Sequence, residues 1–173
     1  MTHTVVIHGD PIERLQALIR RAGVVTADDD LPDELRRHCR GLVVGLDLSE
    51  SVSPRKTRAL LKQEAVRWGE QLRRYPSAVH LLIAVHLPPH VTQSRFLSTA
   101  DGLSLRIHAE LERRARYVDV TLLDVTSCDD AERLADRLLE RISGTAGGYP
   151  AAALTWSDIR DTSIAAATAA NNG

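Results

Sequence analysis

Short apolar runs alternate along this chain with stretches whose apolar residues recur every three or four positions. Apolar runs of this length predict buried strands, and the wider spacing predicts amphipathic helices. Strands that alternate with helices form βαβ units, so we expect a parallel sheet covered by helices on both faces, with right-handed crossovers. The expected strands are 4–7, 24–26, 41–48, 78–87, 118–125 and 151–157, and the expected helices are 11–22, 32–39, 54–74, 98–116 and 129–142.

The start of the first helix carries a recognisable signal. Asp10 fits an N-cap, Pro11 the first helical position, and Glu13 the third, which together make a capping-box pattern. A turn is expected at Asp28–Asp30, before the second helix. We therefore expect the chain to enter a helix directly after Gly9.

One domain accounts for nearly the whole chain. The 173 residues are enough for a single hydrophobic core, and we find no internal repeat and no linker. We assign residues 1–163 to one α/β domain. The last segment, IAAATAANNG (164–173), lacks an apolar pattern that would hold it against a core, so we expect a disordered tail.

Composition argues against several classes of protein. The net charge is −1 and aromatic residues make up 3%, whereas nucleic-acid binders usually carry basic patches and stacking aromatic side chains. Cys39 and Cys128 are too few and too far apart for a disulfide framework or a zinc site, so we expect buried thiols. No apolar run has the length of a membrane span, and the N-terminus does not look like a signal peptide. We expect a cytoplasmic protein that binds neither nucleic acid nor membrane.

Two longer segments suggest a family. LSTADGLSLRIHAEL (97–111) and the stretch from Asp129 to Asp158, with the strand VDVTLLDV (118–125) between them, resemble short-chain dehydrogenases/reductases. The resemblance implies a three-layer, Rossmann-like, doubly wound parallel sheet. Compared with that family, the chain is about one βα unit shorter between Val24 and the strand 41–48. The loop that would form a substrate lid after 118–125 is also missing.

The family's functional residues do not carry over to this chain. The family has a Gly-x-x-x-Gly-x-Gly loop for the cofactor pyrophosphate, but here Gly9 stands alone and is followed by Asp10, Pro11 and Glu13. Acidic groups there would repel a phosphate. The resemblance places Gln93 where the family has its catalytic Tyr, and Leu97 where it has its Lys. We therefore expect neither a cofactor nor catalysis in this chain.

That conclusion does not depend on the register of the alignment. Both lysines, Lys56 and Lys62, precede every tyrosine in the sequence, so no Tyr-x-x-x-Lys motif exists anywhere. The sequence does allow the pairing surface that the resemblance implies. The family's subunits pair through helices equivalent to 54–74 and 98–116, and both are apolar over more than one face. The residues expected at this interface are Leu60, Leu61, Val66, Trp68, Leu72, Leu103, Leu105, Ile107, Ala109 and Leu111. A broad contact within the chain is the open alternative.

The resemblance predicts a non-catalytic subunit that pairs with an intact short-chain dehydrogenase in a heterodimer or heterotetramer. NAD or NADP would bind to the partner. Two alternatives stay open. One is a small enzyme with different chemistry, based on His86, His90 or Asp47. The other is a stand-alone ligand-binding or regulatory domain.

Overall fold

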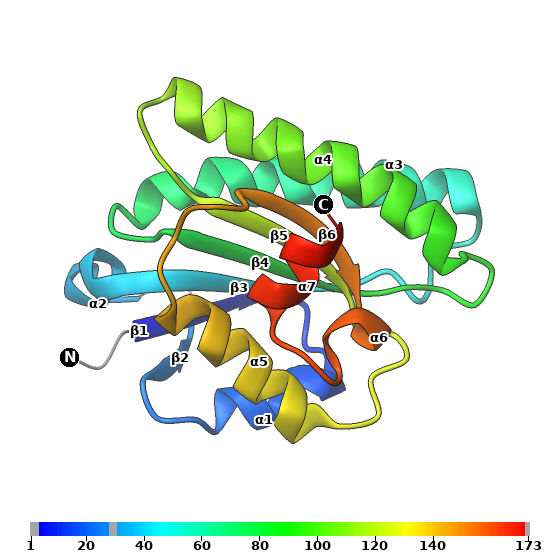
Figure 1. Cartoon of the computed structure of the whole chain (residues 1–173), viewed down its shortest axis with the longest axis horizontal. Coiled ribbons are helices and arrows are strands. Elements are labelled where there is room, and N and C mark those ends of the chain that lie inside the picture. The colour runs from blue at the N-terminus through cyan, green and yellow to red at the C-terminus, as the bar shows by residue number, and fades with distance from the viewer. Residues whose placement is uncertain (1–3, 28–30, 172–173) are drawn as a thin grey trace.

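A computed structural model of the protein describes residues 4–27 and 31–171. Its centre is a six-stranded sheet in which every neighbouring pair is parallel, in the order β2-β1-β3-β4-β5-β6 (Figure 1). The α/β class and the Rossmann-like three-layer architecture are thereby confirmed. The strands are β1 (Thr4–Gly9), β2 (Val24–Thr26), β3 (Cys39–Asp47), β4 (His80–His86), β5 (Asp119–Asp124) and β6 (Ala151–Thr155).

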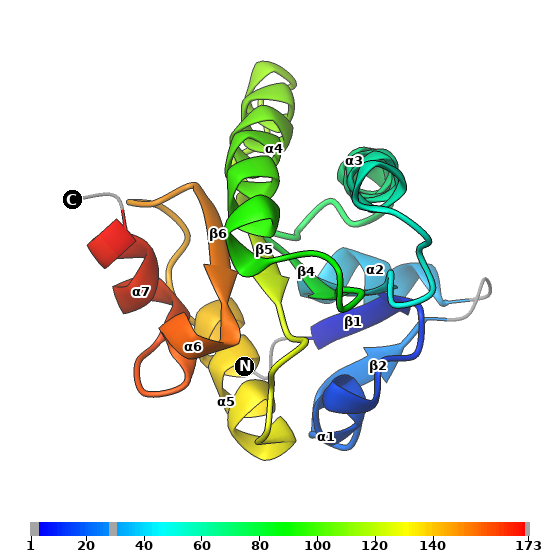
Figure 2. The ribbon, with the colours of Figure 1, turned by 90° about the vertical axis from the view of Figure 1, so that its right-hand side faces the viewer.

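Helices cover both faces of the sheet (Figure 2). The helices are α1 (Gln16–Ile19), α2 (Asp33–His38), α3 (Pro54–Gln71), α4 (Gln93–Arg113), α5 (Ala131–Ser143), α6 (Trp156–Ile159) and α7 (Ile164–Asn171). Helices α2, α3 and α4 pack on one face, and α1, α5, α6 and α7 on the other. Alternate residues of each strand therefore enter two separate hydrophobic layers: Leu81 and Ile83 of β4 face α3 and α4, whereas Leu82 and Ala84 face α5.

The crossovers do not all have the same hand. The connections through α1, α2, α3 and α4 are right-handed, as expected. The connection from β5 to β6 continues toward the same edge as the two before it, but its helix, α5, lies on the opposite face, beside α1. This crossover is therefore left-handed, and the expectation of uniformly right-handed crossovers was wrong. The packing of α5 against α1 and β3 fixes it on that face.

The predicted capping box was also wrong. Residues 10–12 are not helical; the next element is a 3₁₀ turn, Glu13–Leu15, whose N-cap is Ile12 and which receives no side-chain cap. The four-residue α1 follows directly. The Asp10 carboxylate instead accepts a hydrogen bond from the Asp47 N–H on β3, so it does not cap a helix. The turn expected at Asp28–Asp30 lies outside the described residues.

The long helices begin with side-chain caps. Ser53 accepts a hydrogen bond from the Lys56 N–H at the start of α3, as the Ser-Pro pair predicted, and Asp130 accepts one from the Arg133 N–H at the start of α5. Helix α4 begins at Gln93, earlier than the expected position 98, because Thr92 accepts a hydrogen bond from the Arg95 N–H.

The expected disordered tail does not hold for residues 164–171. They form α7, whose Ile164, Ala167 and Thr168 are buried against α5, α6 and β6. Small side chains allow this helix to lie close to its neighbours, so a segment without an amphipathic pattern still contributes to the core.

One arginine ties the two long helices to the sheet. Helix α4 ends in a Schellman motif, in which the N–H groups of Ala115 and Arg116 donate to the carbonyl oxygens of Glu112 and Leu111. The Arg116 guanidinium then donates to the carbonyl oxygens of Leu72, Tyr75 and Ala78, at 2.6, 2.9 and 3.1 Å. The turn between α3 and β4 is thereby fixed to the end of α4.

Candidate functional site at the carboxyl edge of the sheet

Ligands of doubly wound folds bind at the carboxyl edge of the sheet, where neighbouring crossovers leave in opposite directions. In this chain that point lies between β1 and β3. The two strand ends are in direct contact: the Asp10 N–H donates to the Gly45 carbonyl oxygen at 2.8 Å. A Cβ atom on Gly9, whose φ is +84°, would lie 2.1 Å from that same oxygen. Gly9 and Gly45 therefore bring two backbones together, and do not line an open phosphate cradle.

Two carboxylates stand at this junction. Asp10 accepts a hydrogen bond from the Asp47 N–H at 2.9 Å, and Asp47 accepts one from the Ser49 N–H at 3.0 Å. Burial raises the pKa of the Asp47 carboxyl, but the Ser49 hydrogen bonds and nearby His86 outweigh it and hold that pKa below its ordinary value. Pro11 and Glu13 are exposed beside them. These residues do not fit a dinucleotide, because the pyrophosphate would meet negative carboxylates in place of free backbone N–H groups.

His86 and Asp47 form the nearest approach to a catalytic pair. His86 Nδ1 lies 3.5 Å from Asp47 Oδ1, and both side chains are partly exposed. His90 lies in the exposed turn that follows Pro88 and Pro89. Within residues 4–27 and 31–171, no three His, Cys, Asp or Glu side chains gather as a metal site would require. No nucleophile is hydrogen-bonded to either histidine in the described part of the chain.

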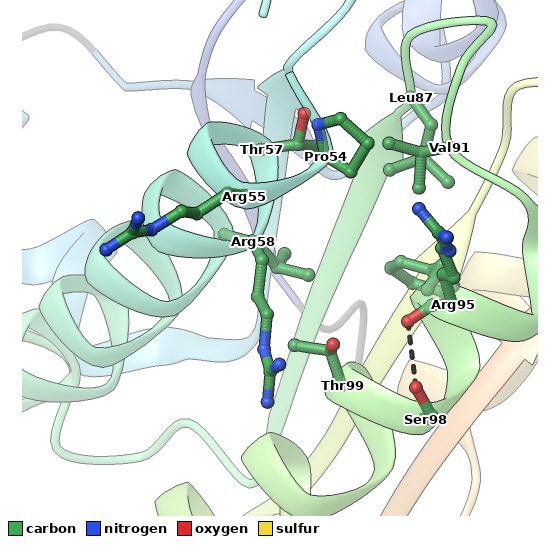
Figure 3. Close-up of a pocket in the computed structure, with 11 residues that line it drawn as sticks. Pro54, Arg55, Thr57, Arg58, Leu87, Val91, Arg95, Ser98 and Thr99 are labelled. Carbon is green, nitrogen blue, oxygen red and sulfur yellow. Dashed lines mark hydrogen bonds between the residues drawn. The ribbon is translucent and has the colours of Figure 1, made fainter.

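Gln93 and Leu97 lie in the first turns of α4. Gln93 is exposed, and Leu97 is half-buried against the core layer of α3 and α4. Beside them, a cavity of about 310 Å³ opens between the N-terminal ends of α3 and α4 (Figure 3). Its lining consists of Pro54, Arg55, Thr57, Arg58, Leu61, Leu87, Val91, Arg95, Phe96, Ser98 and Thr99. We call this space the α3–α4 cavity.

The arginines of the α3–α4 cavity differ in direction. Figure 3 shows the Arg58 side chain running from α3 toward Thr99, and the Arg95 guanidinium lying beside Val91 on the opposite wall. Arg55 points away from the space between the helices. The Ser98 hydroxyl is not available to a ligand in this arrangement, since it donates to the Arg95 carbonyl oxygen at 3.1 Å.

A second hollow, of about 280 Å³, lies between the C-terminal halves of the same helices. Apolar parts of Val66, Gly69, Ile107 and Leu111 form its floor. Charges of both signs surround it, contributed by Glu70, Arg106, Glu110 and Arg114. We call it the α3–α4 groove.

The residues expected at a subunit interface divide into two groups. Six of them are buried within the chain, beneath α3 and α4: Leu61, Trp68, Leu72, Leu103, Ile107 and Leu111. Trp68 packs inward on the ring of His8, with the ring centres 4.9 Å apart. The other four remain accessible: Leu60 and Val66 are half-buried, while Leu105 and Ala109 are exposed.

Sequence reasoning did not identify Arg58 and Arg95. A signal was present, however, because the first turns of α3 and α4 contain arginine and no acidic residue, whereas α2 and α5 begin with acidic residues. Positive side chains at a helix N-terminus oppose the helix dipole. A local rule broken in this way is expected at functional sites.

In the described residues, no helix combines the length and the apolar character needed to cross a membrane. Comparison of the chain with family models, with curated proteins and with solved structures found no match.

Proposed function

We propose that the protein is a non-catalytic, short-chain dehydrogenase-like subunit that pairs with a catalytically intact homologue. One observation carries the proposal: the backbone contact of Asp10 with Gly45, with the Asp10–Asp47 hydrogen bond, fills the point where this fold would hold a pyrophosphate. The six-stranded sheet around that point is nevertheless formed. A fold kept without its cofactor site is best explained by selection on assembly.

The chemistry of the edge supports the same conclusion. The resemblance places Gln93 and Leu97 at the catalytic positions, and neither an amide nor an alkyl group can replace a phenol and an ammonium in proton transfer. Among the described residues, no hydrogen bond joins His86 or Asp47 to the hydroxyl groups of the α3–α4 cavity; those of Thr57 and Ser98 donate to backbone carbonyl oxygens. The partner would supply the catalytic groups and bind NAD or NADP.

The outer face of α3 and α4 provides the surface for pairing. Leu105 is 52% exposed, and Gly102 and Ala109, one turn to either side on α4, let another backbone approach closely. The apolar floor and mixed-charge rim of the α3–α4 groove match the composition of a helix pair of the same kind. A homologous subunit, with equivalent helices across a pseudo-twofold axis, therefore fits this face.

Co-expression tests the proposal. The chain should be co-expressed with each intact short-chain dehydrogenase that its gene neighbourhood encodes, and the mass of any complex measured by light scattering after size exclusion. We expect a mixed dimer or tetramer, with reductase activity higher in the pair than in the partner alone. Leu105→Arg should abolish co-purification, whereas Val52→Arg, at a 77% exposed aliphatic residue outside the pairing helices, should not.

The same experiment can overturn the proposal. Two separate monomeric peaks would refute pairing, as would a complex that survives Leu105→Arg unchanged. Calorimetric titration of the chain alone with NADH and NADPH provides a further check. Saturable binding of either one at the β1–β3 junction would contradict the loss of the cofactor site.

A further inference from the structure

The α3–α4 cavity carries positive charge, and the proposed function does not require it. Arg58 and Arg95 enter it from different helices, and no acidic side chain belongs to its lining. We propose that this cavity binds a small amphipathic anion, which is a carboxylate or phosphate on a short apolar body. The inference is independent of the pairing described above, because the α3–α4 groove occupies the other ends of the helices.

The two arginines are available to a ligand. Among the residues that the structure describes, neither the Arg58 nor the Arg95 guanidinium forms an ion pair or a hydrogen bond. Other arginines of these helices do: Arg67 pairs with Glu64, and Arg113 with Glu110. The cavity thus concentrates unpaired positive charge, and a guanidinium is suited to bind carboxylate or phosphate through two parallel hydrogen bonds.

The apolar floor of the cavity indicates that the rest of the ligand is apolar. Leu61, Leu87 and Phe96 are buried at its base, and Val91 closes one side. An apolar body placed there would remove apolar surface from water while its charged end stays near the arginines. The half-buried Thr99 lies between the two walls and offers a hydroxyl that no described residue binds.

The size of the cavity limits the ligand. At about 310 Å³ it is at the lower end of small-molecule sites. A short alkyl or aromatic acid fits, and a dinucleotide does not. The first turn of α3, at Pro54, adds the positive end of a helix dipole to the same space.

Octanoate and octyl phosphate are suitable probes, with octanamide as the neutral control of the same length. Titration calorimetry and ¹⁵N–¹H chemical-shift mapping should show saturable binding of at least one anion, with shifts centred on residues 95–99. Arg58→Gln and Arg95→Gln should each weaken binding at least fivefold. Arg55→Gln is the matched control, because Arg55 is on the same helix but points away from the cavity, and it should change the dissociation constant less than twofold.

Each result decides for or against the site. Whichever anion binds more tightly identifies the head group. No saturable binding of either anion at 5 mM would overturn the inference. Binding that octanamide reproduces, or that neither Arg58→Gln nor Arg95→Gln weakens, would overturn it as well. Circular dichroism of each variant confirms that a loss of binding is not a loss of folding, and Thr99→Trp, which fills the cavity, should abolish binding in a folded protein.

Discussion

The Asp10 carboxylate accepts a hydrogen bond from the backbone N–H of Asp47, which joins the ends of two neighbouring strands at 2.9 Å. The two residues are 37 positions apart in the sequence. A side chain that would otherwise cap a helix therefore joins two strands, and the carboxyl edge of the sheet is closed at the point where a Rossmann-like fold would be open.

Removing this bond should destabilise the fold. Asp10→Ala should lower the free energy of unfolding by about 1 kcal/mol, since a single charge-assisted hydrogen bond at a partly exposed site is lost. Urea denaturation followed by circular dichroism measures the change. Glu13→Ala is the control: Glu13 is exposed and its side chain forms no described hydrogen bond, so its replacement should change stability by less than about 0.5 kcal/mol. Equal stability of the two variants would show that the bond contributes nothing.

The Arg116 hydrogen bonds should contribute more. Arg116→Met keeps most of the apolar stem but removes the guanidinium hydrogen bonds to four carbonyl oxygens, so we expect a loss of about 3 kcal/mol. Arg114→Met, which removes only an exposed ion pair with Glu110, should cost less than about 0.5 kcal/mol. The same denaturation experiment compares them, and a loss at Arg116 no greater than at Arg114 would contradict this account.

Ala115 is a site where glycine should stabilise the protein. Its φ of 57° places an L-residue in the left-handed region at the end of α4. Ala115→Gly should raise the free energy of unfolding by about 1 kcal/mol, because the Cβ strain exceeds the entropy cost of glycine there. Thermal unfolding measures the gain. An unchanged or lower melting temperature would refute the prediction.

The opposite substitution, glycine to alanine, should also stabilise the protein at Gly102. Gly102 lies within α4, and a Cβ atom added there would meet nothing within 4 Å. Gly102→Ala should therefore stabilise the isolated chain, by about 1 kcal/mol. Opposite substitutions on one helix should thus both raise the melting temperature, and only the backbone conformation distinguishes them.

A buried histidine should make stability depend on pH. His80, at the start of β4, is 1% exposed, and burial, with Arg141 and Arg40 nearby, lowers its pKa from 6.5 to about 4. Asp119 Oδ2 lies 3.8 Å from His80 Nδ1, but it forms its close ion pair with Arg141, at 2.9 Å. The unfolded chain thus binds a proton between pH 6.5 and 4 that the folded chain rejects. Stability contributed by this group is fully present above pH 6.5 and falls as the pH is lowered toward 4.

The expected size of this effect is about 2–3 kcal/mol between pH 7 and pH 4.5. His80→Gln should remove that part of the pH dependence, because the amide does not titrate. His90→Gln, in an exposed turn, should behave as the wild type does. Unfolding free energies measured at both pH values test this, and equal losses in wild type and His80→Gln would contradict it.

The sequence predicted the elements well where local patterns control them. Buried runs such as VVIH and LLIAVH became strands, and Ser53-Pro54 became a helix start, because these signals depend on residues within one turn or one strand. The predictions failed where a residue distant in the sequence determines the local structure. The Asp10 carboxylate is bound by β3, and the tail folds as α7 because α5 and β6 cover it.

The candidate sites follow the same division. The absence of a glycine-rich loop after Gly9 was visible from the sequence, but the close approach of Gly9 to Gly45 depends on the sheet register. Arg58 and Arg95 are separated by a whole βα unit, so only the packing of α3 beside α4 brings them to one cavity. The only local sign of this cavity in the sequence is that the first turns of α3 and α4 contain basic residues and no acidic ones.

The reversed hand of the β5–α5–β6 unit affects how the protein can be synthesised. Helix α5 packs against α1, so Leu15 and Leu18 from the beginning of the chain are covered by Leu134 and Leu138 from near its end. During translation, the first βα unit therefore leaves the ribosome with an uncovered apolar side and stays so until most of the polypeptide has emerged. Apolar surface exposed for that time can associate with other chains, so the N-terminal segment is the part of the nascent chain most prone to aggregation.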